Sequence, residues 1–267
     1  MQLEDAGVLD QKEIRGGYRL LVLKSPRIAP QVQPGQFVHL RVPHLDSSVL
    51  RRPFSVYRTD GDTLSILYKD VGRGTVAMTH LRPGEGVSLI GPLGRGYPAP
   101  HRDRHPVLVA GGYGMAALYL VAREAGRAGT AFFGGQSADD ILCVPEFEAL
   151  GWDVRVATED GSQGVRGLVT DALDPWLAEE PAGRVPEFFA CGPNGMLRAI
   201  GQRAAAAGWT AWLSMDRNMG CGVGACLTCV QKVRARDGGW AWARVCREGP
   251  VFECRDIVWE ENGAAVL

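Results

Sequence analysis

Four cysteines in the last quarter of the chain constrain its fold and chemistry more than any other feature. Cys221, Cys226 and Cys229 follow one another with the spacing C-x4-C-x2-C, and Cys246 comes after a further apolar stretch that we expect to form a hairpin. The loop is rich in glycine, which lets the backbone bend tightly and turn its N–H groups toward sulfur atoms. This spacing is typical of the plant-type loop that binds a [2Fe–2S] cluster. The sequence therefore predicts a metal site made of these four cysteines, in a protein that transfers single electrons.

Two other uses of cysteine stay open from the spacing alone. A structural zinc site usually presents two C-x2-C-like pairs, whereas this chain has one such pair. Disulfide bonds form in oxidising compartments, and the opening residues MQLEDAGVLD do not resemble an apolar signal segment. The total of seven cysteines is also odd. We therefore favour an iron–sulfur cluster over zinc or disulfides.

A fifth cysteine competes for the role of fourth ligand. Cys254 lies only eight residues beyond Cys246. We prefer Cys246, because the sequence Val-Cys-Arg-Glu-Gly-Pro at 245–250 is typical of a turn at the end of a strand.

Length and charge set broad limits on the rest of the chain. The 267 residues are enough for two domains and a small third unit. The formal net charge of −1 does not favour binding to nucleic acid or to an anionic membrane surface. No apolar run approaches the roughly 18 residues of a membrane-spanning helix. We therefore expect a cytoplasmic protein that binds neither nucleic acid nor a membrane.

The first hundred residues have the pattern of an antiparallel β-barrel or sandwich. Short apolar runs alternate with turns, and Asp60-Gly61 marks a hairpin between two of them. The expected strands are Tyr18–Leu23, Gln36–Val42, Arg52–Arg58, Thr63–Lys69 and Val87–Ile90. Regular spacing of this kind predicts a small barrel in residues 1–100.

Two stretches of this region have the composition of an anion site. The strand Arg52-Pro53-Phe54-Ser55 combines a guanidinium with a hydroxyl, and Pro53 keeps one N–H out of the sheet ladder. Leu67-Tyr68-Lys69 precedes Gly74-Thr75, which opens a helix expected at Val76–Leu81 and there offers free N–H groups. Arg52, Lys69 and this turn together would bind a pyrophosphate, and Tyr68 would stack on an aromatic ring. An ordinary edge strand and a plain helix cap remain the alternatives.

From Pro106 onward strands alternate with helices. The expected strands are Val107–Ala110, Thr130–Phe133, Asp153–Thr158 and Glu187–Ala190. The expected helices are Met115–Ala128, Asp139–Leu150, Leu168–Glu179 and Gly195–Ala207. Alternation predicts a parallel, doubly wound α/β nucleotide-binding domain in residues 101–209, followed by a small cluster-binding domain in residues 210–267.

Ligands of such a sheet bind at the carboxyl ends of its strands. Those ends carry Gly111, Gly112 and Gly114, then Gly134-Gly135, then Cys191, Gly192 and Pro193. From its position Cys191 is either a small buried hydrophobic residue or a residue that faces the ligand. The five histidines (His39, His44, His80, His101 and His105) show no ligand-like spacing, and we expect them at the surface or in loops. No catalytic triad or pair of carboxylates is apparent, and we assign no catalytic residue.

Together these motifs, in this order, resemble the ferredoxin reductase-like flavoproteins. More narrowly, the chain is similar over nearly its whole length to the electron-transfer subunits of class 1B dihydroorotate dehydrogenases. The resemblance implies that the four cysteines bind a [2Fe–2S] cluster and that the barrel binds FAD. It also implies that Gly91-Pro92-Leu93-Gly94 ends the barrel and that the α/β domain binds NAD.

The resemblance implies a function as well. A partner catalytic subunit containing FMN would oxidise dihydroorotate in pyrimidine (UMP) biosynthesis, and electrons would reach NAD+ through the cluster and FAD. The expected assembly is a heterotetramer with two copies of each subunit. Arg52 would bind the FAD pyrophosphate, Gly74-Thr75 a phosphate and Ser55 the flavin edge, and Cys191 would lie near the nicotinamide. The cluster loop would lie at the subunit interface.

Two alternative functions remain. The first is a related NAD(P)H-dependent reductase subunit that serves another acceptor, such as ferredoxin or sulfide. Some such relatives use an aspartate as a cluster ligand, and Asp216 lies near the cysteine loop in the sequence. The second is a zinc-stabilised nucleotide sensor without catalytic activity.

The chain departs from the family at one turn. Where relatives have a Gly-Gly-Gly-Ile/Thr-Gly sequence, this chain has Gly-Gly-Tyr-Gly-Met at 111–115. We expect the Tyr113 side chain to crowd the place where the dinucleotide approaches the backbone.

Overall fold

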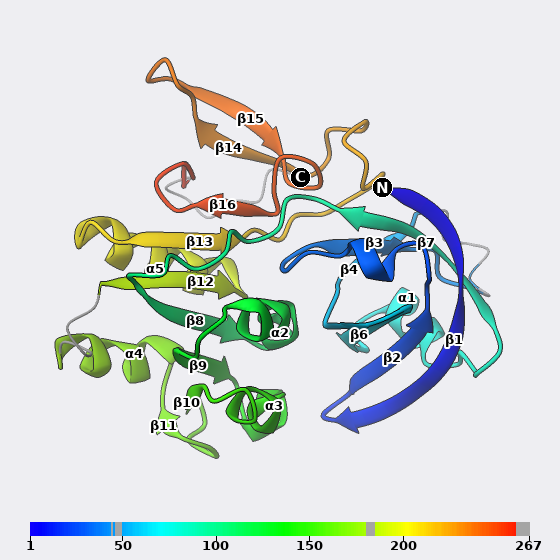
Figure 1. Cartoon of the computed structure of the whole chain (residues 1–267), viewed down its shortest axis with the longest axis horizontal. Coiled ribbons are helices and arrows are strands. Elements are labelled where there is room, and N and C mark those ends of the chain that lie inside the picture. The colour runs from blue at the N-terminus through cyan, green and yellow to red at the C-terminus, as the bar shows by residue number, and fades with distance from the viewer. Residues whose placement is uncertain (44, 46–49, 180–184, 260–267) are drawn as a thin grey trace.

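The chain folds into a β-barrel, an α/β sheet and a small hairpin that lies against both (Figure 1). The computed structural model describes residues 1–43, 45, 50–179 and 185–259. In these residues no helix has the length and apolar character that crossing a membrane requires.

The barrel is one curled, antiparallel sheet of seven strands in the order β4-β3-β7-β1-β2-β6-β5. Its strands are β1 (Gln2–Arg15), β2 (Tyr18–Lys24), β3 (Phe37–Leu40), β4 (Arg52–Ser55), β5 (Arg58–Asp60), β6 (Thr63–Lys69) and β7 (Gly86–Leu93), with a 3₁₀ turn η1 (Ala29–Gln31) and a helix α1 (Arg73–Met78). Phe54 of β4 and Tyr68 of β6 meet edge to face at 6.0 Å, which shows that the sheet curls back on itself. The predicted barrel is confirmed, and β4 is an edge strand, as Pro53 indicates.

Strand β1 was not predicted, because its sequence carries little apolar signal. Along Gln2–Arg15 only Ala6 and Val8 are buried apolar residues, and the third buried residue is Glu4. The Glu4 carboxylate accepts hydrogen bonds from Ser25 Oγ (2.5 Å) and from the backbone N–H of Arg27 (3.0 Å). A buried acid with several donors thus replaces the hydrophobic residue that the pattern requires.

The hairpin predicted at Asp60-Gly61 is present. Strands β5 and β6 pair antiparallel, Asp60 opposite Thr63, and Gly61 adopts a positive φ of 53°. The single strand expected at Arg52–Arg58 is divided into β4 and β5, which lie at opposite edges of the sheet.

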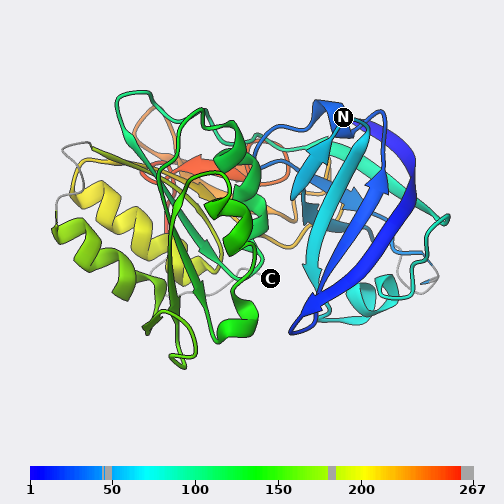
Figure 2. The ribbon, with the colours of Figure 1, turned by 60° about the horizontal axis from the view of Figure 1, so that its bottom comes forward.

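The second sheet has the order β11-β10-β9-β8-β12-β13-β16 and is parallel from β11 to β13. Its strands are β8 (His105–Gly111), β9 (Thr130–Gly135), β10 (Asp153–Thr158), β11 (Val165–Arg166), β12 (Pro186–Cys191), β13 (Thr210–Ser214) and β16 (Val251–Glu253). Its helices are α2 (Gly114–Glu124), α3 (Val144–Glu148), α4 (Val169–Ala178) and α5 (Asn194–Ala206), with a 3₁₀ turn η2 (Ala138–Asp140). Helices α2 and α3 lie on the face toward the barrel, and α4 and α5 cover the opposite face (Figure 2). The predicted doubly wound α/β fold is confirmed.

One helix was predicted wrongly. The segment expected as a continuous helix over Asp139–Leu150 consists of the turn η2 and the short helix α3. Cys143 precedes α3 with a left-handed φ of 64°, and Pro145 lies in the first turn. A helix cannot continue through a left-handed residue, and proline is tolerated only near a helix start.

The segment beyond residue 209 does not stand apart from the α/β sheet. Strand β13 pairs with β12, and β16 pairs antiparallel with β13. The remaining strands, β14 (Val230–Arg234) and β15 (Trp240–Arg244), form the hairpin expected between the third and fourth cysteines. The division of the chain into domains 1–100, 101–209 and 210–267 therefore remains a proposal. In it, the cluster-binding domain contributes strands to the sheet of the α/β domain.

The barrel and the α/β sheet are joined by a partly buried ion pair. Lys69 Nζ of β6 and the Tyr18 hydroxyl of β2 each lie 2.9 Å from the same oxygen of Asp140 in η2. Burial by itself would raise the pKa of Asp140, but the hydrogen bonds from Lys69 and Tyr18 outweigh it and lower the pKa below its usual value. The ionised carboxylate thus stabilises the contact between the two domains.

We expect Asp140→Ala to lower the free energy of unfolding by about 2 kcal/mol, because the variant leaves Lys69 and Tyr18 without their acceptor. Because the pKa of Asp140 is lowered in the folded protein, its carboxylate stabilises the fold at neutral pH. This stabilisation is lost as the pH falls through the lowered pKa and the carboxylate is protonated. Chemical denaturation across pH measures the difference. Asp139→Ala, the loss of an exposed neighbouring carboxylate, is the control. Equal stability of the two variants at pH 7 would contradict this role.

Candidate redox site

At the expected anion site, strand β4 lies next to the start of helix α1. A Cβ atom placed on buried Gly74 would lie 3.3 Å from Nε of Arg52, so the guanidinium lies directly against the first turn of α1. Thr75 Oγ1 accepts hydrogen bonds from the N–H groups of Val71 (3.0 Å) and Gly72 (3.1 Å) and shapes this turn. The structure therefore joins two of the three expected parts of the pyrophosphate site.

The third part lies elsewhere. The Lys69 ammonium is held at Asp140 and above the Tyr18 ring, 4.6 Å from its centroid. The Tyr68 ring is buried in the barrel, where it packs against Phe54, and its hydroxyl donates to Gln11 Oε1 (3.3 Å). In this structure both side chains have partners within the protein. The Tyr68 ring meets Phe54 edge to face, and the stacking expected of Tyr68 at the ligand site stays a prediction. Leu67 packs outward, in the cluster of side chains between the two domains.

Ser55 and Pro53 lie on the outer face of the barrel. In the antiparallel pair of β3 and β4, Phe37 is opposite Ser55 and His39 is opposite Pro53. Residues directly opposite each other share one face of a sheet. The inner neighbours of Phe37 and His39, such as Val38, belong to the barrel core, which places Ser55 and Pro53 on the other side.

The three glycine turns of the α/β sheet converge at one edge, as expected. A Cβ atom on Gly111 would lie 2.7 Å from Cδ of Pro193, and one on Gly114 would lie 2.1 Å from the carbonyl oxygen of Cys191. The N–H of Gly112 donates to the carbonyl of Gly134 (3.2 Å). Gly111 and Gly114 are thus required for close packing of the turns, which is a structural reason for glycine in addition to nucleotide binding.

Cys191 and Asp216 lie close together at this edge of the sheet. Burial, followed by the charge of Asp216, raises the pKa of Cys191 to about 12. Cys191 is therefore a neutral thiol at this edge of the sheet.

We expect Tyr113→Gly to lower the KM for NADH by about tenfold with little change in kcat, because the Tyr113 side chain is 53% exposed at the turn that a dinucleotide approaches. Steady-state kinetics with a dye acceptor separates the two constants. Tyr119→Phe, a change within the neighbouring helix, is the control. A raised KM in Tyr113→Gly would show that the ring contributes to binding instead of obstructing it.

The cysteine loop directs several backbone donors at sulfur. Cys221 Sγ accepts the N–H groups of Val223 (3.4 Å), Ala225 (3.3 Å) and Cys226 (3.4 Å). The Thr228 hydroxyl lies 3.2 Å from Cys226 Sγ, and its hydrogen bonds lower the pKa of that thiol to about 6. Such donors stabilise the negative charge of thiolates, which are the form of cysteine that binds metal.

The four thiols form two pairs. Cys226 lies beside Cys221, and the N–H of Cys246 donates to Cys229 Sγ (3.4 Å). Among the residues that the structure describes, no three His, Cys, Asp or Glu side chains are arranged to hold a metal ion. A [2Fe–2S] cluster has two irons, each with two cysteine ligands, so two pairs of thiols fit this group.

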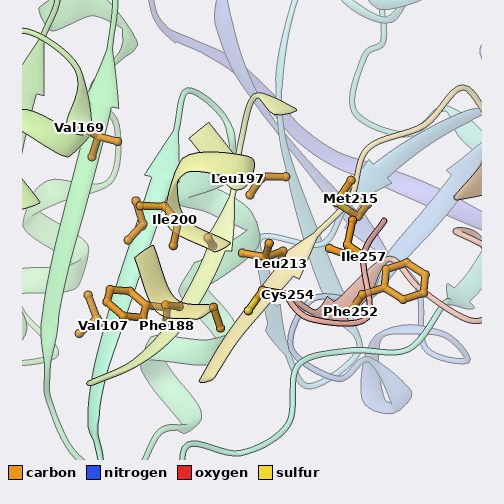
Figure 3. Close-up of a cluster of buried hydrophobic side chains, with 14 of the residues drawn as sticks. Val107, Val169, Phe188, Leu197, Ile200, Leu213, Met215, Phe252, Cys254 and Ile257 are labelled. Carbon is orange, nitrogen blue, oxygen red and sulfur yellow. The ribbon is translucent and has the colours of Figure 1, made fainter. Parts of the chain in front are cut away.

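Within the described residues Cys254 makes no hydrogen bond to the other cysteines, and its thiol lies 3.5 Å from Oε1 of Glu253. Figure 3 shows it among Leu213, Phe252 and Ile257, in the hydrophobic core of the α/β sheet. A Cβ atom on Gly201 of α5 would lie 3.3 Å from Cys254 Cβ. Burial raises the pKa of Cys254 to about 11, as expected of a structural thiol.

The cysteine loop and the turn that follows β15 pack on the outer face of the barrel. Phe37 of β3 and Leu93 of β7 share a buried cluster with Cys229 and Cys246. At the end of the barrel the N–H of Arg95 donates to the carbonyl of Gly249 (2.5 Å). Arg244 Nη1 holds the loop itself, through the carbonyl of Gly224 (3.0 Å).

His39 was predicted wrongly. It is fully buried in β3, on the outer face of the barrel beneath the cysteine loop, although we expected every histidine at the surface or in a loop. The four-residue run Phe-Val-His-Leu is buried throughout, which indicates a strand covered on both faces. The position of His39 within a short apolar run was the sequence signal that could have predicted its burial. His44 lies outside the described residues.

A barrel that packs on a doubly wound α/β sheet, with a cysteine loop on its outer face, defines an iron–sulfur flavoprotein of the ferredoxin reductase type. The iron–sulfur cluster binding domain of dihydroorotate dehydrogenase B matches residues 216–258. A relative from Bacillus mycoides (strain KBAB4), a dihydroorotate dehydrogenase B (NAD(+)) electron transfer subunit, is 35% identical over 97% of this chain and 99% of its own length. A subunit of the same name from Bacillus cereus (strain Q1) is 34% identical over the same shares.

Solved structures agree with this assignment. A chain from the structure of an NADH-dependent reduced ferredoxin–NADP oxidoreductase superposes with a TM-score of 0.82 at 26% identity, over 95% of this chain and 90% of that one. The ferredoxin reductase of carbazole 1,9a-dioxygenase shares the fold, with a TM-score of 0.66 at 19% identity over 78% of this chain and 66% of its own.

The chain belongs to the family of dihydroorotate dehydrogenase B electron-transfer subunits. It is thus a subunit of an oxidoreductase, as the sequence predicted, and the expected cofactors FAD, [2Fe–2S] and NAD are those of this class.

Proposed function

We propose that this chain transfers electrons between the FMN of a partner dihydroorotate dehydrogenase subunit and NAD+, in pyrimidine (UMP) biosynthesis. The observation that carries the proposal is the position of the cysteine loop, which covers the outer face of β3 beside the expected flavin strand β4. In a family of electron-transfer subunits, this arrangement puts the cluster ligands between the flavin site and the surface of the chain.

The bound groups supply the redox chemistry, since FAD exchanges a hydride with NAD+ and single electrons with a [2Fe–2S] cluster. The protein binds and orients them. Arg52 and the first turn of α1, with Gly74 and Thr75, neutralise the FAD pyrophosphate. Ser55 offers its hydroxyl to the flavin edge from the outer face of β4.

The glycine turns at the carboxyl edge of the α/β sheet bind the dinucleotide. Gly111, Gly112 and Gly114 open the first turn, and Cys191, Gly192 and Pro193 form the turn packed against it. The neutral Cys191 thiol lies near the nicotinamide. It presents no charge that would oppose hydride transfer.

The four cysteines would hold a [2Fe–2S] cluster, with Cys221 paired with Cys226 and Cys229 with Cys246. The second pair is buried against the barrel, while Cys226 is exposed. The cluster would therefore lie between the flavin side and solvent. This orientation suits a centre that exchanges electrons with another protein.

The surface that we propose for the partner lies beside the pair that contains the exposed Cys226. Leu227, Trp240 and Trp242 are 61%, 53% and 50% exposed. Leu227 and Trp242 line a hollow of about 470 Å³ together with Arg244 and Glu248. Exposed tryptophans next to a polar rim are typical of a protein interface.

The partner of this surface is an FMN-containing catalytic subunit, and the assembly has two copies of each chain. We place it in the cytoplasm. The alternative, a reductase subunit that serves ferredoxin, draws on the likeness to the ferredoxin–NADP oxidoreductase chain. The dihydroorotate dehydrogenase relative matches the chain more closely in sequence, at 35% identity against 26%.

Purification from the native host tests the proposal. We expect the chain to be recovered with an equal amount of an FMN protein, and the complex to reduce NAD+ with dihydroorotate. The isolated chain should oxidise NADH with a dye but should not turn over dihydroorotate. Recovery with a partner that lacks FMN would reject the dihydroorotate assignment and favour the ferredoxin alternative.

A further inference from the structure

His39 lies between the expected flavin strand and the cysteine loop. It is opposite Pro53 of β4 on one side and Ile90 of β7 on the other. Side chains alternate along a strand, and Val38 and Leu40 point into the barrel core. The imidazole of His39 therefore leaves the barrel on the face that the cysteine loop covers.

The loop touches the imidazole directly at Gly222. A Cβ atom on Gly222 would lie 2.5 Å from Nδ1 of His39, 2.9 Å from Cγ and 3.0 Å from Cε1. Gly222 also has a positive φ of 70°, so both its conformation and its contact with the ring favour glycine. The next residue back is Cys221, whose sulfur accepts three backbone N–H groups. The ring thus packs on the part of the loop that carries the first cluster ligand.

Neither ring nitrogen has a hydrogen-bond partner among the described residues, although His39 is 0% exposed. The other buried side-chain atoms in this condition are Nε atoms of arginines, whose remaining nitrogens can still bond. The backbone of Cys221 interacts with the ring without the geometry of a full hydrogen bond. An imidazole is mostly neutral at physiological pH, with one N–H donor. A buried donor of this kind requires an acceptor, or an apolar residue would be more stable in its place.

We propose that His39 is a positioning residue for electron transfer, which fixes the cysteine loop against the flavin barrel and donates its ring N–H to a sulfur of the bound cluster. The proposal rests on the proposed function, because it requires the cluster in this loop. An N–H donor to sulfur stabilises the reduced cluster, which carries the greater negative charge. His39 therefore raises the reduction potential of the cluster and makes the cluster easier to reduce.

Replacement of the imidazole by an apolar side chain tests this assignment. We expect His39→Leu to lower the equilibrium constant for cluster reduction about tenfold, a shift of about −59 mV for a one-electron couple. His39→Phe, which keeps a ring but has no N–H, should shift the potential in the same direction. His39→Gln, which restores a donor, should recover much of the wild-type value. A redox titration followed by electron paramagnetic resonance gives the potential without any measurement of activity.

Three controls separate the possible results. The exposed His80→Leu variant should keep the wild-type potential. The flavin potential, read in the same titration, should change less than that of the cluster. Flavin content and thermal stability show whether each variant is folded. If His39→Leu does not fold, the comparison is made between His39→Phe and His39→Gln.

Two results would overturn the proposal. An unshifted cluster potential in folded His39→Leu or His39→Phe would show that the ring N–H has no acceptor there. Equal shifts in the Leu, Phe and Gln variants would assign His39 a packing role only. A wild-type protein without any cluster signal would instead reject the proposed function, and the inference with it.

Discussion

Cys246→Ser is expected to lose the iron–sulfur cluster, whereas Cys254→Ser keeps it. Cys246 lies against Cys229, its backbone N–H donates to that sulfur, and it is buried where the loop meets the barrel. A serine hydroxyl is a poor ligand for iron compared with a thiolate. We expect electron transfer to the partner to fall by about 100-fold or more, since metal sites lose 10- to 100-fold even when only the groups around the ligands are changed. Oxidation of NADH with a dye, which requires only FAD, should persist.

Cys254→Ser is the matched control for this prediction. Cys254 packs on Gly201 in the core of the α/β sheet, so its replacement should lower stability and leave iron content unchanged (Figure 3). Analysis of iron and acid-labile sulfide in both purified variants gives the result. Loss of iron in Cys254→Ser with retention in Cys246→Ser would reverse the assignment of the fourth ligand.

Arg52→Ala is expected to weaken FAD binding by about 100-fold. The guanidinium of Arg52 lies on the first turn of α1, where it is placed to neutralise a pyrophosphate together with the helix N–H groups. The loss of one charge-assisted contact costs about 3 kcal/mol, or about 100-fold in Kd. Fluorescence titration of the flavin-free protein with FAD measures this change, and NADH oxidation should be restored at high FAD concentration.

Arg82→Ala is the control, because Arg82 is a barrel arginine that bonds the backbone of Thr79 and Leu81 at the far end of α1. Both variants lose one positive charge, so a general electrostatic effect on an anionic ligand would appear in both. If Arg52→Ala binds FAD as tightly as Arg82→Ala, the pyrophosphate is bound elsewhere.

The fold was largely predictable because its signals are local. The alternation of apolar strands and helices from Pro106 onward needed no knowledge of distant contacts, and Asp60-Gly61 marked its hairpin. The order of motifs predicted the family, which the comparisons confirm. The cysteine spacing identified the loop, and the structure places its four thiols in two pairs. The ligand assignment itself remains a prediction, to be settled by the cysteine variants.

What the sequence could not supply depends on contacts between distant segments. Strand β1 is held by the hydrogen bonds of Glu4, which no hydrophobic pattern records. Lys69 was expected at the anion site but pairs with Asp140, seventy-one residues further along the chain. His39 is covered on the outer face of the barrel by the cysteine loop at Gly222, far along the chain. In each case the side chain contacts residues that are distant in the sequence, and local periodicity does not predict such contacts.

Anaerobic reduction of the purified chain by NADH, followed by visible absorption and electron paramagnetic resonance, tests the central claim most directly. We predict a yellow-brown protein that contains about two irons and two sulfides per FAD. On addition of NADH its flavin should bleach, and the signal of a reduced [2Fe–2S] cluster should appear. A colourless protein that contains zinc and shows neither change would contradict the account.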